Sequence, residues 1–367
     1  MAAIGAGRQG AGVWRDRRIA LPIGGTRRAA ILLPSLLLLL LALAVLSVGR
    51  GALAIEPSQV VAILLGKAGI TLDTPYTAQQ AAVLWNIRLP RVLLAMLVGG
   101  ALSISGATLQ GIFRNPLTDP GLIGVSSGAA LGAVAGIILG LTTLGTFALP
   151  LAAFGGGLVA TLLVYSLARH GGRTDVVTLI LTGVALNAIA GAGTGFLIFY
   201  ASDAQLRTIV FWSFGSLASA TWRSTLAVAP LILIGMALLP RWGRSLNLLA
   251  LGEREARHLG LETERLRLAL IILTALLTGA AVAVCGTVGF IGLVVPHLLR
   301  LINGPDHRTL LPASALGGAA LLTLADLAAR TVAAPVEIPL GVVTALAGGP
   351  FFLWLLQRTR RAQGGSE

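Results

Sequence analysis

The chain has 367 residues, of which 56% are hydrophobic and 11% charged, and its mean hydropathy is +0.88. Soluble globular domains carry about 25% charged residues, so a soluble fold is excluded and membrane lipid is the expected solvent. The net charge of +13 is spread between apolar runs and forms no basic stripe with aromatic residues, which excludes a nucleic-acid partner.

The apolar runs predict an all-α integral membrane protein. Lipid offers no hydrogen-bond partners, so the backbone must form helices or a closed barrel. Runs such as 31–48 and 268–284 contain no charged residue and are longer than barrel strands. We therefore expect about ten transmembrane helices. The expected spans are 29–48, 92–111, 121–140, 147–168, 177–199, 225–240, 266–285, 289–302, 311–329 and 340–357.

Residues 1–28 precede the first span and are basic. Positive charge beside spans marks the cytoplasmic side, so we expect a cytoplasmic N-terminus. A small-residue triplet, Ala52–Ala54, resembles a signal-peptide cleavage site. Cleavage is the less favoured alternative, because the preceding run is longer than a signal core and many spans follow.

Residues 49–87 are too polar to span and are expected outside the membrane, on the periplasmic side. A surface helix is predicted over 57–66, and a turn around 73–75. An even number of spans returns the tail 358–367 to the cytoplasm, where its arginines satisfy the positive-inside rule. By the same count the Arg-bearing loops 169–176 and 241–265 are cytoplasmic.

Two sequence echoes predict an inverted repeat. Residues 99–106 resemble 279–286, and 183–186 resemble 341–344. The members of each pair would cross the membrane in opposite directions, as inverted repeats in transporters require. The alternative is that membrane helices rich in small residues resemble one another by chance. Most of the 47 glycines are expected to allow close helix packing.

A charged segment inside the loop 241–265 forms the first candidate site. Residues 253–259 read as a short helix between two glycines, a compact polar projection suited to a groove on a soluble partner. A solvated loop helix without a partner is the alternative. The segment consists of Gly252, Glu253, Arg254, Glu255, Ala256, Arg257, His258, Leu259, Gly260 and Leu261. A second motif, residues 113–121, carries two prolines and predicts a turn at the membrane edge.

Four runs in this order resemble the iron–siderophore, haem and vitamin B12 permease family of ABC importers. They are Arg88–Arg91, Gly111–Ser126, Ala250–Leu261 and Gly289–His297, and the resemblance extends from about residue 85 to 356. It implies a homodimer of ten-span subunits in the bacterial inner membrane. It also implies a pair of cytoplasmic ATPase subunits and a periplasmic substrate-binding protein as partners.

The resemblance also implies roles for particular residues. The helix at 252–261 would couple to the ATPase, and Arg88, Arg91 and Arg330 would dock the binding protein by charge-assisted contacts. The alternative for these arginines is that they extend to lipid headgroups. The cytoplasmic gate would comprise the turn at Asn115 and Leu117 and the loop 174–177. Here Val176 and Val177 depart from the small polar residues of the B12 permease.

The run 113–132 is most similar to haem permeases, so haem is the expected substrate, with a ferric siderophore or vitamin B12 as alternatives. His170, His258, His297 and His307 all fall near the expected cytoplasmic side. Haem would therefore cross without a histidine ligand from this subunit. No resident cofactor or metal is expected in this chain, and the lone Cys285 is expected to serve only packing.

Two other classes compete with this interpretation. An ion-coupled secondary transporter would bury ionisable residues near the midplane. The most embedded acid, Asp326, instead lies near the outer end, with Arg330 one helical turn away. A membrane-embedded enzyme would need a cluster of catalytic groups, and none is evident. The chain also lacks a phosphate-binding Gly-Lys-Ser/Thr loop, so it is not expected to be an enzyme, and ATP would bind the partner ATPase.

Overall fold

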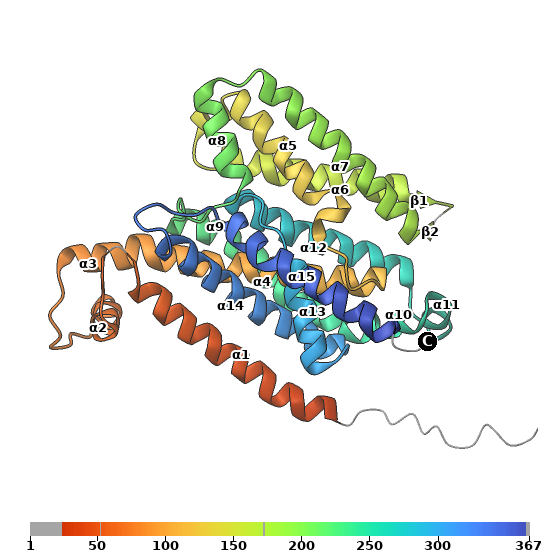
Figure 1. The fold of residues 1–367 in the computed structure, drawn as a ribbon, viewed down its shortest axis with the longest axis horizontal. Coiled ribbons are helices and arrows are strands. Elements are labelled where there is room, and N and C mark those ends of the chain that lie inside the picture. The colour runs from red at the N-terminus through yellow and green to blue at the C-terminus, as the bar shows by residue number, and fades with distance from the viewer. Residues whose placement is uncertain (1–23, 52, 172, 365–367) are drawn as a thin grey trace, which may run out of the picture.

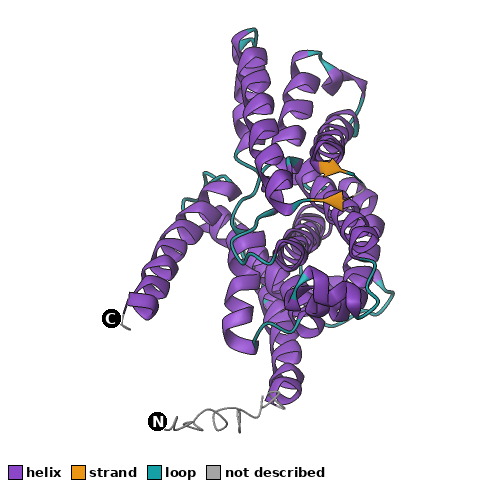
Figure 2. Cartoon of the chain, turned by 90° about the vertical axis from the view of Figure 1, so that its right-hand side faces the viewer, coloured by secondary structure: helices purple, strands orange, loops and turns teal. Residues whose placement is uncertain are grey.

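The computed structural model describes residues 24–51, 53–171 and 173–364, which are nearly all helical (Figures 1 and 2). The exceptions in regular structure are β1 (Arg169–His170) and β2 (Arg173–Thr174), which form one short antiparallel pair. Residues 1–23, most of the predicted basic cytoplasmic segment, lie outside the described residues, as do 365–367 at the end of the predicted tail.

Each predicted span overlaps a helix. The ten helices are α1 (Gly24–Gly49), α4 (Leu89–Phe113), α5 (Val125–Ile138), α6 (Ala148–Ala168), α7 (Val176–Phe199), α9 (Trp222–Leu238), α12 (Thr263–Cys285), α13 (Ile291–Asn303), α14 (His307–Thr331) and α15 (Leu340–Gly364). In the described part of the chain, seven helices are long and apolar enough to cross a membrane. The shorter apolar helices are α5, α13 and the 340–354 part of α15. The prediction of an all-α membrane protein is confirmed.

Shorter helices connect these spans. The surface helix predicted over 57–66 is present as α2, and the charged helix predicted over 253–259 as α11. The connecting elements are α2 (Pro57–Lys67), α3 (Ala78–Val83), the π-helix η1 (Leu84–Arg88), the 3₁₀ helices η2 (Pro120–Ile123), η3 (Leu141–Leu144) and η4 (Leu239–Trp242), α8 (Asp203–Ser213), α10 (Gly243–Leu251) and α11 (Glu253–His258).

Helix α8 was not predicted from the hydropathy pattern, because it is too short and polar to span. Its start is set by a reciprocal cap in which the Ser202 and Gln205 side chains each bond the other's backbone N–H. A Ser followed three residues later by Gln is a helix-start signal that the sequence does contain. Gln205 also donates to the carbonyls of Ile137 and Ile138, at the end of α5.

Helix α4 is the centre of the bundle and packs against α9, α12, α13 and α14. Glycine makes these contacts close. A Cβ added at Gly99 would collide with the Gly318 carbonyl of α14, and one at Gly106 with the Gly292 carbonyl of α13. In lipid, such close approach replaces the hydrophobic effect as the source of helix association. Gly99 and Gly106 therefore serve the predicted tight packing, whereas nothing lies within 4 Å of a Cβ added at Gly191 or Gly195 in α7.

A second group, α5, α6 and α7, lies beside the first and contacts it through α12 (Figure 1). Helices α5 and α6 meet at Gly128, Gly132 and Gly156, where an added Cβ would collide with the facing backbone. Helix α7 is less enclosed, and half of its large apolar side chains are exposed in the single chain. That exposure fits a lipid-facing or subunit-facing position.

The bundle has two opposite ends, each of which holds residues with a predicted role. We call the end with Arg91 the arginine end, and the opposite end, with α10, α11 and the β1–β2 pair, the coupling end (Figure 1). Helix α4 starts at the arginine end, whereas α12 starts at the coupling end, where Arg267 contacts Thr174. The two helices carrying the first sequence echo thus run in opposite directions. The inverted repeat itself remains a prediction.

Candidate functional sites at the two ends of the bundle

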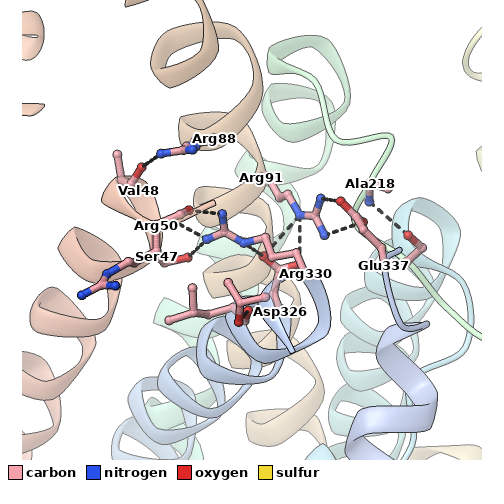
Figure 3. Close-up of polar contacts among 12 residues, drawn as sticks. Ser47, Val48, Arg50, Arg88, Arg91, Ala218, Asp326, Arg330 and Glu337 are labelled. Carbon is pink, nitrogen blue, oxygen red and sulfur yellow. Dashed lines mark hydrogen bonds and ion pairs between the residues drawn. The ribbon is translucent and has the colours of Figure 1, made fainter. Parts of the chain in front are cut away.

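Arg91 is the centre of a charge network at the arginine end (Figure 3). Its Nε donates to Asp326 at 2.9 Å, and its two terminal nitrogens donate to Glu337 at 2.9 and 3.0 Å. Arg330, one turn after Asp326, also faces that carboxylate at 3.4 Å. The predicted Asp326–Arg330 pair is present, and Asp326 has Arg91 as a second, closer partner.

Arg88 and Arg330 both bind the C-terminal end of α1 (Figure 3). Arg88 donates to the carbonyls of Val48 and Gly49, each at 2.9 Å, and Arg330 donates to the carbonyl of Arg50 at 2.7 Å. The last carbonyls of a helix lack intrahelical partners and carry partial negative charge. Two arginines from other helices therefore cap α1 and fix it against α4 and α14.

A local change of helix type places Arg88 there. Residues 78–113 form one long apolar helical segment, in which η1 is a short stretch of π-helix. A π-helix has more residues per turn than an α-helix, so it changes the direction in which the following side chains point. Trp85 in η1 has its carbonyl bonded by the Trp222 indole at 2.7 Å, and the two rings lie 5.4 Å apart. The π segment is thus fixed by contact with α9.

The three predicted docking arginines are therefore grouped at one end, but they are not free surface cations. Arg88 and Arg91 are 5% and 7% exposed, and all three guanidinium groups bond within the chain. The contact between Arg91 and Glu337 was not predicted from the sequence, because Glu337 lies in the loop 332–339, where no helical or strand spacing indicates which residues meet. Docking of a binding protein by these arginines remains a prediction.

A cavity of about 580 Å³ lies near the same end, between the 142–147 loop, α8 and the end of α12. Its lining includes the aromatic rings of Phe147, Phe211 and Trp212 and the guanidinium of Arg223, which lies 4.7 Å from the Phe147 ring centre. Within the described part of the chain, no histidine lines it.

At the coupling end, the predicted gate residues fall in two short segments. Asn115 starts a turn in which its side-chain oxygen accepts from the Leu117 N–H at 2.9 Å, and the Leu117 side chain is 42% exposed. The second segment begins α7. The Asp175 side chain caps this helix by accepting from the Thr178 N–H at 2.8 Å, and Val177 is 63% exposed.

The Asp175 cap is electrostatically favourable. Hydrogen bonds from the Thr178 backbone and hydroxyl lower the pKa of Asp175, with smaller help from the charge of Arg267. A charged carboxylate at a helix N-terminus is stabilised by the unpaired N–H groups there. Val176 and Val177 therefore occupy the first turn of a helix whose N-terminus is stabilised by the Asp175 cap.

The predicted coupling helix is present as α11, which begins after Gly252 and ends at His258. Its one buried residue is Ala256, whereas Leu251 and Leu259, on either side of it, are 66% and 61% exposed. Gly252 has φ +137°, a left-handed conformation that favours glycine and lets the chain turn between α10 and α11. The element thus presents charged and apolar side chains outward.

Glu253 ties this helix to the rest of the bundle. It pairs with Arg257 one turn later and with Arg267 of α12 at 3.2 Å. Burial raises the pKa of Glu253, but the Arg257 hydrogen bond and the charge of Arg267 outweigh it, so the pKa is lowered overall. Sequence reasoning missed Arg267, although its spacing of three residues from Glu264 is a helical pairing signal.

The four histidines lie at the coupling end, as the sequence indicated. His170 is in β1, His258 ends α11, and His307 starts α14 with its ring 2.9 Å from the Asn247 side chain. His297, on α13, lines a small cavity together with Leu117 of the predicted gate turn. Among the described residues, no group of three or more His, Cys, Asp or Glu side chains could hold a metal ion.

Comparisons with known proteins show which family this fold and sequence belong to. A family model described as the FecCD transport family matches residues 37–358. The chain is 46% identical over 314 residues to the hemin transport system permease protein HmuU of Yersinia pestis, covering 82% of this chain and 92% of that protein. It is 44% identical over 290 residues to the cobalamin import system permease protein BtuC of Halobacterium salinarum, covering 79% and 77%.

A third relative is the vitamin B12 import system permease protein BtuC of Shigella boydii, 43% identical over 296 residues, with 81% and 90% covered. Among solved structures, an inward-facing conformation of a metal-chelate type ABC transporter matches 89% of this chain and 98% of that chain, with a TM-score of 0.79 and 34% identity. The chain therefore belongs to the FecCD transport family, and it is the multi-span permease subunit of an ABC importer of the inner membrane.

Proposed function

We propose that this permease moves haem from a periplasmic binding protein to the cytoplasm. The observation that carries the proposal is the 46% identity, over most of both chains, to a protein named as a hemin permease. The motif over 113–132, which resembles haem permeases, supports the same substrate. The alternatives are vitamin B12, favoured by the relatives at 44% and 43% identity, and a ferric siderophore.

The cavity near the arginine end supports haem on chemical grounds. Its aromatic rings suit stacking on a flat apolar macrocycle, and Arg223 suits pairing with a carboxylate. A lining whose described residues include no histidine suits transport, because strong axial ligation would slow release of the iron. Haem would be cargo that passes through the permease, and we propose no resident cofactor for the chain.

Family membership implies an ATPase and a substrate-binding protein as partners. We propose that α11, with residues 252–261, docks on a cytoplasmic ATPase dimer that binds and hydrolyses ATP. The exposed Leu251 and Leu259 beside a charged helix suit a groove on a soluble partner. In the proposed orientation the coupling end, both chain termini and the gate at Asn115, Leu117, Val176 and Val177 face the cytoplasm.

We also propose that two copies of the chain form the pore. The support is the exposed apolar surface of α7, where Val177, Leu181 and Val184 follow helical spacing and are 63%, 64% and 53% exposed. A homodimer would cover this surface and leave the substrate path between the subunits.

The experiment that decides the substrate uses proteoliposomes containing the permease, its ATPase and internal ATP. Haem, cobalamin and a ferric siderophore are each offered on their own binding protein, and internal accumulation is measured. We expect haem alone to accumulate efficiently. Accumulation of cobalamin without haem would overturn the substrate while leaving the importer assignment intact.

The coupling role is tested separately. Replacing Glu253–His258 with a Gly/Ser stretch removes the polar projection but leaves the spans intact. We expect a folded permease that no longer copurifies with the ATPase and no longer transports. If copurification and transport both survive, α11 is not the docking element.

A further inference from the structure

We propose that Arg267 is a positioning residue that links α11 to the gate segment 174–177, so that displacement of α11 moves the start of α7. The inference rests on the proposed function, because it assumes that α11 receives the ATPase. It assigns to one buried side chain the mechanical connection between ATP hydrolysis and the gate.

The guanidinium of Arg267 joins three elements. One terminal nitrogen donates to the Thr174 carbonyl at 2.7 Å and to Glu264 of its own helix at 3.0 Å. The other donates to Glu253 of α11 at 3.2 Å. The planar arginine fork can make several such bonds at once, which the compact lysine ammonium cannot do in the same geometry.

Thr174 is held through both of its backbone polar groups. Its carbonyl accepts from Arg267, and its N–H donates to the Glu264 carboxylate at 3.1 and 3.2 Å. The next residue, Asp175, caps α7. The position of Thr174 therefore determines where the first turn of α7, with Val176 and Val177, begins.

Burial makes this connection stiff. The Arg267 side chain is 1% exposed, and the Glu253 and Glu264 side chains are each 27% exposed. Separating a buried charge from its partner is costly, so α11 cannot move away from Arg267 without the cluster following or breaking. The same burial keeps Arg267 out of direct contact with an ATPase, so its effect must pass through its neighbours.

The test uses the full complex of permease, ATPase and binding protein in proteoliposomes, with haem as the probe. Arg267→Gln removes the three-way link. The matched control is Arg265→Gln, two residues earlier on the same helix, whose side chain is 84% exposed and pairs with Glu262. Because Cys285 is the one cysteine in the sequence, Val177→Cys in a Cys285→Ala background gives a single thiol reporter at the gate.

Substrate transported per ATP hydrolysed and the nucleotide dependence of thiol labelling at position 177 are both measured. For Arg267→Gln we expect unchanged ATPase copurification, a loss of about tenfold in substrate per ATP, and no nucleotide-dependent change in labelling. Arg265→Gln should match the parent protein. Retention of both the transport ratio and the labelling response in Arg267→Gln would overturn the link.

A second variant keeps the test decisive if Arg267→Gln fails to assemble. Glu253→Gln weakens the connection between Arg267 and α11 while keeping Arg267, and it also weakens the Glu253–Arg257 pair within α11. Its transport is therefore expressed per bound ATPase. The expected result is again a lost labelling response, and a parental response would reject the link. A parent complex without ATP-driven uptake would instead overturn the proposed function itself.

Discussion

Arg91 and Glu337 lie 246 positions apart in the chain and face each other through two parallel hydrogen bonds of 2.9 and 3.0 Å (Figure 3). The third arm of Arg91 reaches Asp326 at 2.9 Å. The two carboxylates differ in environment, because the Asp326 side chain is 1% exposed and that of Glu337 is 41% exposed. One guanidinium thus joins α4 to α14 and to the loop before α15.

This difference predicts unequal costs of substitution. Arg91→Met leaves the buried Asp326 with only the weaker Arg330 contact, so we expect a loss of about 3–5 kcal/mol in the free energy of unfolding. Glu337→Gln removes a half-exposed partner and should cost less than about 1 kcal/mol. Unfolding in detergent by denaturant or heat measures both. Equal effects of the two changes would contradict the buried-pair interpretation.

Close glycine packing predicts a position-specific effect of alanine. Gly106→Ala places a methyl group against the Gly292 carbonyl and should destabilise the protein by about 1–3 kcal/mol. The matched control is Gly191→Ala, in α7, where nothing lies within 4 Å of the added Cβ. That change should stay within about 0.5 kcal/mol of the parent. The same unfolding assay measures both variants. A Gly106→Ala protein as stable as the parent would refute the close contact between Gly106 and Gly292.

Asp306, in the loop between α13 and α14, predicts a defined pH dependence. A hydrogen bond from Arg308, aided by Asn247 and opposed by burial, lowers the pKa of Asp306 from 3.8 to about 2. A lowered carboxyl pKa stabilises the folded state above its unfolded value, and this contribution is lost as the pH falls through about 2. Asp306→Asn should therefore be less stable than the parent at neutral pH, with the difference shrinking as the pH falls from 3.8 towards about 2. A difference that grows on acidification would contradict the pairing.

The location of the histidines predicts that haem uptake does not need them. We expect a variant with glutamine at positions 170, 258, 297 and 307 to accumulate haem at a rate close to the parent, because the described residues that line the cavity near the arginine end include no histidine. His307 bonds Asn247, so its replacement must keep a polar side chain. ATP hydrolysis by the complex serves as the control for coupling. Lost uptake with normal hydrolysis would show that a histidine handles the iron.

Docking by Arg88, Arg91 and Arg330 predicts a salt-sensitive interaction with the binding protein. Charge pairs that the small exposed parts of these side chains form with a partner are screened over about 8 Å at physiological ionic strength. Glutamate at all three positions should weaken binding by about tenfold or more. Because these arginines also hold the bundle together, folding of the variant is checked first, and Arg241→Glu provides a control for added negative charge. An affinity that is unchanged across the salt series would remove them from the interface.

The helices that overlap the ten predicted spans, the surface helix α2 and the charged helix α11 could all be predicted from the amino-acid sequence. These features depend on hydropathy and helix signals that are local to each segment, because every backbone group in lipid must bond within its own helix. The grouping of Arg88, Arg91 and Arg330 at one end also followed, since each lies at the same side of a predicted span.

What those charges contact could be learned only from the folded chain. Docking of a partner protein stays a prediction for Arg88, Arg91 and Arg330. The fold adds that Arg88 and Arg330 bond carbonyls at the end of α1, and that Arg91 binds a glutamate from a loop without a periodic signal. From the sequence, Arg267 is indistinguishable from other positive charges beside a membrane span. The fold buries it between α11 and the start of α7. The pairing of a charge depends on which distant segments pack around it, and glycine contacts between helices, rather than the pattern within any one helix, set that arrangement.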